Sequence, residues 1–131
     1  MFSPDALHEA ATRFGFIRRG RRNWTRRVVD FIQLVNLQNS AWSSHDTYTN
    51  FALWPLALGE PPIIAESKFL FRTRAEDLGA TEPDALFRAV DRLHTLADLR
   101  IALGAHELTG MLGWQLRDLL GSEAITPASQ R

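Results

Sequence analysis

The sequence predicts an α+β domain with a single antiparallel sheet of four or five strands, an N-terminal helix and C-terminal helices packed against the sheet. Three observations predict this class: a helical apolar pattern before residue 15, short strand-like runs separated by turn residues between 16 and 73, and helical patterns after residue 81. Short strands joined by tight turns form antiparallel sheets, and helices segregated from strands along the chain are typical of α+β proteins. With 131 residues, we expect one domain at 1–121 and a frayed tail at 122–131.

The first helix is predicted to begin at Ser3-Pro4, where a capping hydroxyl precedes proline at the first helical position. Its apolar residues follow at helical spacing and form one stripe: Leu7, Ala10, Ala11 and Phe14. Gly15 is expected to end the helix, because glycine readily adopts the left-handed conformation found at helix ends.

Five strands are expected, at 16–19, 23–27, 31–38, 47–54 and 67–73. The clearest is 31–38, which carries apolar residues on both of its faces. We therefore expect it to lie inside the sheet and to be covered on both sides along its first half. A polar loop containing Trp42 precedes the fourth strand, and Pro55 ends that strand because proline cannot donate to a sheet ladder.

The second helical region is predicted to begin with Thr81 as its capping residue and to end at Gly104, and a further helix is predicted at 106–120 with Met111 facing inward. Gly110 and Gly113 weaken that last helix. The expected core comprises Phe14, Phe16, Leu34, Val35, Phe51, Leu53, Phe69, Val90 and Leu116.

Composition and charge exclude several classes of function. The chain has no cysteine, which excludes disulfides, thiolate catalysis and cysteine-ligated zinc. It lacks a secretion signal and any apolar stretch that could span a bilayer, so we expect a cytoplasmic protein without membrane contact. The net charge is zero, but residues 1–50 hold seven arginines against four acids, and residues 51–131 hold eight basic residues against eleven acids.

Four segments resemble a family of small bacterial domains catalogued as domain of unknown function 4304. They are GFIRRG at 15–20 followed by Trp24, IQLVNLQNS at 32–40, YTNF at 48–51 and the arginine-rich FRTR at 71–74. The resemblance covers roughly residues 5–75 well and implies the same fold class, but it implies no activity. Asn39 stands where the family usually has a basic residue, so a partner contact made by that residue would be lost or moved here.

No catalytic or metal-binding motif is found. His106-Glu107 begins like a zinc-protease motif, but Gly110 occupies the position of its second histidine. The sequence contains no G-x-S-x-G nucleophile elbow and no phosphate-binding loop. We therefore expect no cofactor and favour a non-enzymatic role, with an enzyme of unrecognised type as a minor alternative.

The most distinctive feature is a cluster of seven arginines without an intervening acid: Arg13, Arg18, Arg19, Arg21, Arg22, Arg26 and Arg27. Such a cluster can bind an anion, or it can be a solvated surface paired with acids of the C-terminal half. Strand alternation places Arg22 and Arg26 on the same side as Trp24. If the arginines form a site, they should converge with Asn36 or Asn50.

Amides in the two central strands provide a second group of candidates. Asn36 and Gln38 share a face and can line a groove with Asn50 of the next strand, or the amides can fix neighbouring loops. An exposed Trp42 would indicate a protein partner. The candidate binding residues are Arg19, Arg22, Trp24, Arg26, Asn36, Gln38, Trp42 and Asn50.

These features favour an interaction module that binds another bacterial protein, for example in an immunity or antitoxin-like role. The alternative is a binder of a small anionic ligand or of nucleic acid through the arginine-rich hairpin. The zero net charge argues against nucleic acid, because proteins that bind it usually carry a clear positive excess.

Overall fold

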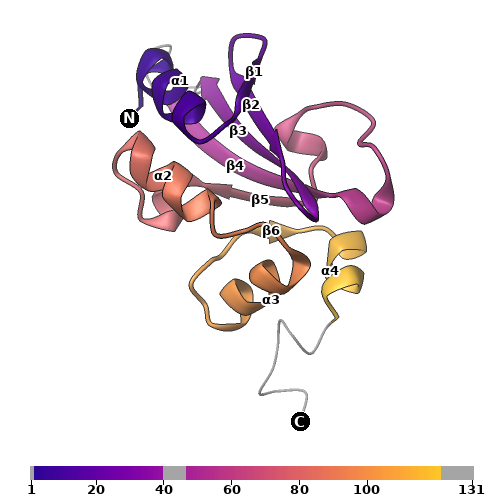
Figure 1. Cartoon of the computed structure of the whole chain (residues 1–131). Helices are drawn as coiled ribbons and strands as arrows, with labels where there is room; N and C mark the ends of the chain where they lie inside the picture. The colour runs from indigo at the N-terminus through magenta and orange to yellow at the C-terminus, as the bar shows by residue number, and fades with distance from the viewer. Residues whose placement is uncertain (1, 40–46, 122–131) are drawn as a thin grey trace.

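A single antiparallel sheet organises the molecule in the computed structural model, which describes residues 2–39 and 47–121 (Figure 1). Its strands lie side by side in the order of the chain, each antiparallel to the next. In the described residues they are β1 (Ile17–Arg19), β2 (Asn23–Arg27), β3 (Phe31–Asn39), β4 (Thr47–Pro55), β5 (Phe71–Arg74) and β6 (Met111–Leu112). The predicted α+β class is confirmed, with one strand more than expected.

Helices flank the strands in the chain. The described α-helices are α1 (Pro4–Arg13), α2 (Pro83–Val90), α3 (Leu96–Gly104) and α4 (Trp114–Leu120), and short 3-10 turns occur at η1 (Leu56–Leu58), η2 (Glu66–Lys68) and η3 (Ala75–Leu78). The Ser3 hydroxyl accepts a hydrogen bond from the Ala6 amide at 3.1 Å and so caps α1 as predicted. Gly15 follows the helix with a φ of 82°, a conformation that favours glycine.

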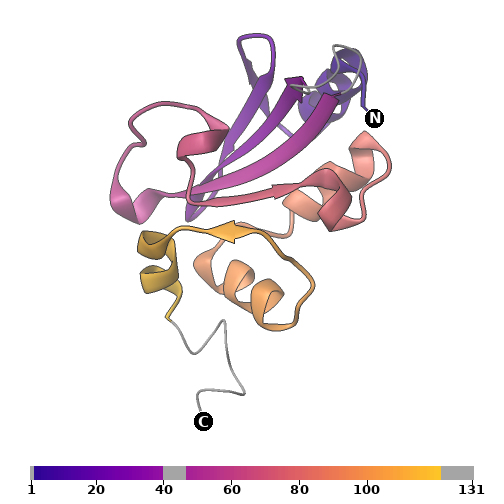
Figure 2. The same cartoon turned by 180° about the vertical axis from the view of Figure 1, so that it is seen from behind.

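Strand β3 separates two hydrophobic clusters, which confirms that it is internal and covered on both faces along its first half. Phe31 and Val35 belong to the larger cluster, which includes residues of α1 and α2. Ile32 and Leu34 belong to the smaller one, which lies under the segment 56–70. We call the side that packs on α1 and α2 the covered face and the opposite side the open face; Figures 1 and 2 view the molecule from these two sides.

The predicted helix at 106–120 is wrong in its first half, which forms β6 instead. A Cβ on Gly110 would lie 2.5 Å from the carbonyl oxygen of Arg72 and 2.8 Å from the ring of Phe71. Glycine therefore lets the chain approach β5 closely enough to pair with it. Met111 does not face inward as expected, since it is 63% exposed, whereas Leu116 of α4 is fully buried.

The single helical region expected up to Gly104 is in fact two helices, α2 and α3. Thr81 does not cap α2; the residue before that helix is Glu82, and it makes no capping bond with its side chain. The capping box instead precedes α3, where the Thr95 hydroxyl accepts from the Asp98 amide and the Asp98 carboxylate accepts from the Thr95 amide. This box starts a new helix and so ends the continuous pattern.

The expected core is confirmed at eight of its nine positions. Phe14 is the exception: it is half-buried and stacks on Phe87 with ring centroids 5.8 Å apart. Strand β5 begins at Phe71 rather than at 67, because η2 occupies residues 66–68. The expectations for Trp42 and for the tail at 122–131 lie outside the described residues. No described helix has the length and apolar character needed to cross a membrane.

Candidate functional site

The open face carries a straight row of polar residues across five neighbouring strands. The pairing register places Arg19 opposite Asn23, Asn23 opposite Asn36, Asn36 opposite Asn50, and Asn50 opposite Arg74. Residues directly opposite each other in antiparallel strands project their side chains to the same face. We call these five residues the amide row: three asparagines between two arginines.

Hydrogen bonds join the amides of the row. The Asn50 side-chain nitrogen donates to the Asn36 oxygen and to the Gln38 oxygen, both at 3.0 Å. The Asn36 nitrogen in turn donates to the Asn23 oxygen at 2.8 Å. Within residues 2–39 and 47–121, the side-chain nitrogens of Gln38 and Asn23 donate to no other residue.

The two arginines at the ends of the row are both exposed, and neither forms an ion pair with a described residue. The Arg74 guanidinium lies 4.1 Å from the ring centroid of Tyr48, which holds it by a cation–π contact. The Arg19 Nε donates to the Thr25 hydroxyl at 3.3 Å, which leaves its two terminal nitrogens without a described partner. Each end of the row therefore presents a positioned cation.

The Arg74 end of the row opens into a groove of about 740 Å³. Its basic and amide lining comes from Gln38, Asn50, Arg72 and Arg74, and its acidic lining from Glu66, Glu76 and Asp77. Arg72 is already engaged, because it lies 3.5 Å from the Glu66 carboxylate and contacts the Met111 sulfur at 3.3 Å. The groove therefore offers hydrogen-bond donors and, in Arg74, a cation without an ion-pair partner among the described residues, beside acids that oppose a polyanion.

The structure divides the predicted site residues between the two faces. Asn36, Gln38, Asn50 and Arg19 lie on the open face, as a shared site requires. Trp24 lies on the covered face, where it is fully buried and donates to His8 Nδ1 at 3.1 Å. The predicted alternation of the hairpin is thus correct, but only one of its candidate arginines, Arg19, joins the amides; Trp42 lies outside the described residues.

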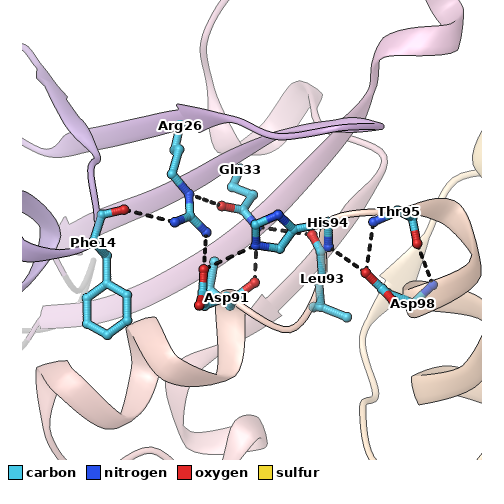
Figure 3. A network of polar contacts seen from close by, with 9 residues as sticks. Phe14, Arg26, Gln33, Asp91, Leu93, His94, Thr95 and Asp98 are labelled. Atoms are coloured by element: carbon cyan, nitrogen blue, oxygen red, sulfur yellow. Dashed lines mark hydrogen bonds and ion pairs between the residues drawn. The ribbon is translucent and has the colours of Figure 1, made fainter.

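Arg22 and Arg26 turn away from the amide row. Arg22 donates to the Asn39 side-chain oxygen at 3.0 Å. Arg26 lies on the covered face, where Figure 3 shows its guanidinium among three acceptors: Gln33 Oε1 at 2.8 Å, the Phe14 carbonyl at 2.8 Å and Asp91 Oδ1 at 2.9 Å. Every branch of that guanidinium is therefore occupied within the protein.

The buried amide Gln33 completes this network. Its nitrogen donates to the carbonyl oxygens of Val90 and Leu93, both at 3.0 Å, and so fixes the end of α2 on the sheet. Burial raises the pKa of Asp91, but hydrogen bonds with His94 and Arg26 outweigh it and lower that pKa below the usual 3.8. Gln33 and Arg26 thus hold the fold together.

Three arginines of the N-terminal cluster pair with acids of the C-terminal half. The pairs are Arg13 with Asp84, Arg26 with Asp91, and Arg27 with Glu60. This is the arrangement expected of a solvated cluster whose partners lie later in the chain. The charge asymmetry of the sequence therefore reflects, in part, contacts within the molecule.

Sequence reasoning missed Asn23, Tyr48 and Arg74 as site residues. The arginine-rich segment 71–74 was visible as a family motif, but its face could not be assigned without the start of β5. Asn23 was expected in the second strand, but the sequence did not indicate which residue of the third strand lies opposite it. Among residues 2–39 and 47–121, no group of three or more histidine, aspartate or glutamate side chains is placed to hold a metal ion.

Comparison with known proteins identifies a family that the chain matches. The family model described as domain of unknown function (DUF4304) matches residues 7–102, a range that extends from α1 into α3 and contains the whole amide row. No curated protein and no solved structure matched the chain.

Proposed function

The chain belongs to the DUF4304 family, and we propose that it is a non-enzymatic bacterial interaction module whose open face binds another protein. The cytoplasmic location and the immunity or antitoxin-like role expected from the sequence are part of this proposal. The observation that carries it is the amide row, an ordered set of amides and guanidinium groups that lies outside both hydrophobic clusters. Such side chains can satisfy the backbone groups of a second polypeptide.

The composition of the open face favours a protein over nucleic acid. Single-stranded nucleic acids bind through exposed aromatic side chains on which bases stack. On the described open face, Tyr48 lies against the Arg74 guanidinium and Trp54 is only 9% exposed. The acids Glu66, Glu76 and Asp77 in the adjoining groove would also repel a phosphate backbone.

The residue types of the face match those of protein interfaces. Arginine and tyrosine are enriched at such interfaces, and Arg74 with Tyr48 forms a preassembled pair of this kind. The asparagines hold one another in place, so less side-chain entropy is lost when a partner binds. The polar half of the face is therefore suited to recognition with little rearrangement.

Selection from a displayed library of random peptides tests the proposal. Peptides enriched on the wild-type protein should bind an Asn36→Leu variant at least about tenfold more weakly, because the substitution interrupts the row. A Gln115→Leu variant, which changes an amide of α4 outside the row, should bind them like the wild type. Thermal melting verifies that both variants are folded. Failure to enrich any peptide, or equal binding by all three proteins, would contradict the proposal.

A further inference from the structure

The ends of the amide row specify the chemistry of the partner. We infer that the row receives an extended acidic segment carrying two carboxylates six residues apart, one bound by Arg19 and the other by Arg74. This inference rests on the proposed function, since it names the partner chemistry of the same face. Charge complementarity carries it: the two exposed arginines at the ends of the row have no ion-pair partner among the described residues.

The spacing follows from the geometry of the sheet. The row crosses from β1 to β5, and neighbouring strands lie about 4.8 Å apart, so the Cα atoms of Arg19 and Arg74 are separated by about 19 Å. An extended chain rises about 3.3 Å per residue, so six residues span about 20 Å. Successive side chains of an extended chain point to opposite sides, so an even separation puts both carboxylates toward the row, whereas a separation of five residues turns one away.

Amide donors in the row and beside it favour an extended segment over a helix. The side-chain nitrogens of Gln38 and Asn23 donate to no other described residue, and they can donate to the carbonyl oxygens of a bound chain. An α-helix uses its backbone carbonyls internally, except in its last turn, and so cannot accept these bonds along its length. The occupant that uses both the cations and the amides is therefore an extended polypeptide.

The acids beside the row limit how many charges the ligand can carry. Glu76 and Asp77 line the groove next to Arg74, and Glu66 already neutralises Arg72. A continuous run of negative charges would meet these carboxylates, whereas two separated carboxylates meet only the two arginines. Each guanidinium can bind a carboxylate through two parallel hydrogen bonds, a geometry that favours well-spaced acidic side chains.

Titration of synthetic peptides by fluorescence anisotropy tests the inference. Three labelled twelve-residue peptides share a neutral background of serine, threonine and valine. The first has glutamates six residues apart, the second has them five residues apart, and the third has glutamines six residues apart. The proteins are the wild type and the variants Arg19→Gln, Arg74→Gln and Arg18→Gln. Arg18 is the matched control because it neighbours Arg19 in β1 but lies 5.1 Å from the Trp24 ring on the covered face.

The first peptide should bind the wild type about tenfold more tightly than the second, which loses one charge-assisted contact at a surface. The third peptide loses both contacts and should bind more weakly than the second. Arg19→Gln and Arg74→Gln should each lose about five- to tenfold, and Arg18→Gln should bind like the wild type. Physiological salt should weaken the binding of the first peptide.

Equal binding of the three peptides, a loss with Arg18→Gln as large as with Arg19→Gln, or no binding at all would overturn the inference. The proposed function fails separately. If peptides selected from the random library depend on Asn36 but lack paired acids, the face is a protein-binding site with another chemistry. If the library yields no such peptides either, both the inference and the proposed function are wrong.

Discussion

The two faces of the sheet use the same residue types in opposite ways. On the covered face, Arg26 lies beside the amide of Gln33, and each branch of its guanidinium ends on an acceptor within the protein. On the open face, Arg74 lies opposite the amide of Asn50, and its described contact is with the ring of Tyr48. The Arg26 side chain is only 16% exposed, whereas Arg74 is exposed. An arginine beside an amide is thus structural on one face and available to a ligand on the other.

The face to which a strand residue points, rather than its place in the sequence, decides whether an arginine stabilises the fold or is available to a ligand. Arg26 and Arg27 are neighbours in β2, yet Arg26 joins the buried network and Arg27 pairs with the exposed Glu60. A charged cluster in a hairpin is divided in this way whenever its two faces have different surroundings. Substitutions on each face should therefore affect different properties, stability on one and binding on the other.

The largest effect is expected in the apolar half of the open face, where Leu34 is fully buried beside Trp54. Leu34→Ala should lower the free energy of unfolding by about 2–5 kcal/mol, because it removes buried methyl groups and leaves a cavity. Ile17→Ala is the control, since Ile17 belongs to the same cross-strand row but is 61% exposed, and it should change stability by about 0.5 kcal/mol or less. Urea denaturation measures both. A similar decrease in the free energy of unfolding for the two variants would show that Leu34 does not belong to a hydrophobic core on this side of the sheet.

The comparison between arginines predicts a smaller but still clear difference. Arg26→Ala should destabilise the protein by about 2–3 kcal/mol, because it leaves the Gln33 oxygen without its donor and the Asp91 carboxylate with His94 as its described partner. Arg19→Ala should cost less than about 1 kcal/mol, since Arg19 is exposed and its side chain makes one hydrogen bond among the described residues, to Thr25. The free energy of unfolding from urea denaturation tests both values. Equal losses would break the distinction between the two faces.

Acid should destabilise the protein mainly by protonating a carboxylate that pairs with the covered face, Asp91. The pKa of Asp91 is lowered in the folded protein despite burial, because hydrogen bonds with His94 and Arg26 favour the carboxylate. A lowered folded pKa adds stability above the unfolded value of about 3.8, and this stability is lost as the pH falls through the folded pKa. The urea concentration at the midpoint of wild-type unfolding should therefore decrease as the pH is lowered below about 4.

Asp91→Asn should flatten the part of this drop that Asp91 causes. Part of the drop should remain in this variant, because a second carboxylate, Asp98, also accepts hydrogen bonds. Figure 3 shows these bonds, which come from the backbone amides of His94 and Thr95. Burial opposes ionisation of Asp98 as well, but these backbone bonds lower its pKa. Asp118→Asn, which changes an exposed carboxylate of α4, is the control. If the urea midpoint falls equally steeply with pH in the wild type and in Asp91→Asn, then Asp91 is not the cause of the loss of stability in acid.

The sequence predicted those helices and strands whose caps, turns and apolar patterns lie within a few residues of the element itself. Strands β2 and β3 were assigned to within one residue, because turn residues bound both strands and the two-faced apolar pattern of β3 marks it as internal. Helix α1 was predicted from its cap and apolar stripe. In contrast, β6 exists because Gly110 allows close approach to β5, a contact between segments far apart in the chain that no local pattern reveals.

The site was only partly predictable for a related reason. Alternation within β3 showed that Asn36 and Gln38 share a face, and the structure confirms that Asn50 joins them. The inclusion of Asn23 and Arg74 depends on the pairing register of four neighbouring strand pairs. Register follows from turn geometry and from the burial of whole strands, so one sequence read locally does not determine it.

A small effect on stability, and the sharpest test of the open face, is expected at Tyr48. Tyr48→Ala removes the ring that holds the Arg74 guanidinium, and an exposed cation–π contact contributes about 0.5–1 kcal/mol, so the free energy of unfolding should fall by no more than about 1 kcal/mol. Binding of the peptide with glutamates six residues apart should nevertheless weaken about threefold or more, because Arg74 loses its fixed orientation. Tyr48→Phe keeps the ring and should bind like the wild type. If Tyr48→Ala also binds like the wild type, the ring does not prepare Arg74 for a ligand, and if Tyr48→Phe weakens binding equally, the hydroxyl rather than the ring is responsible.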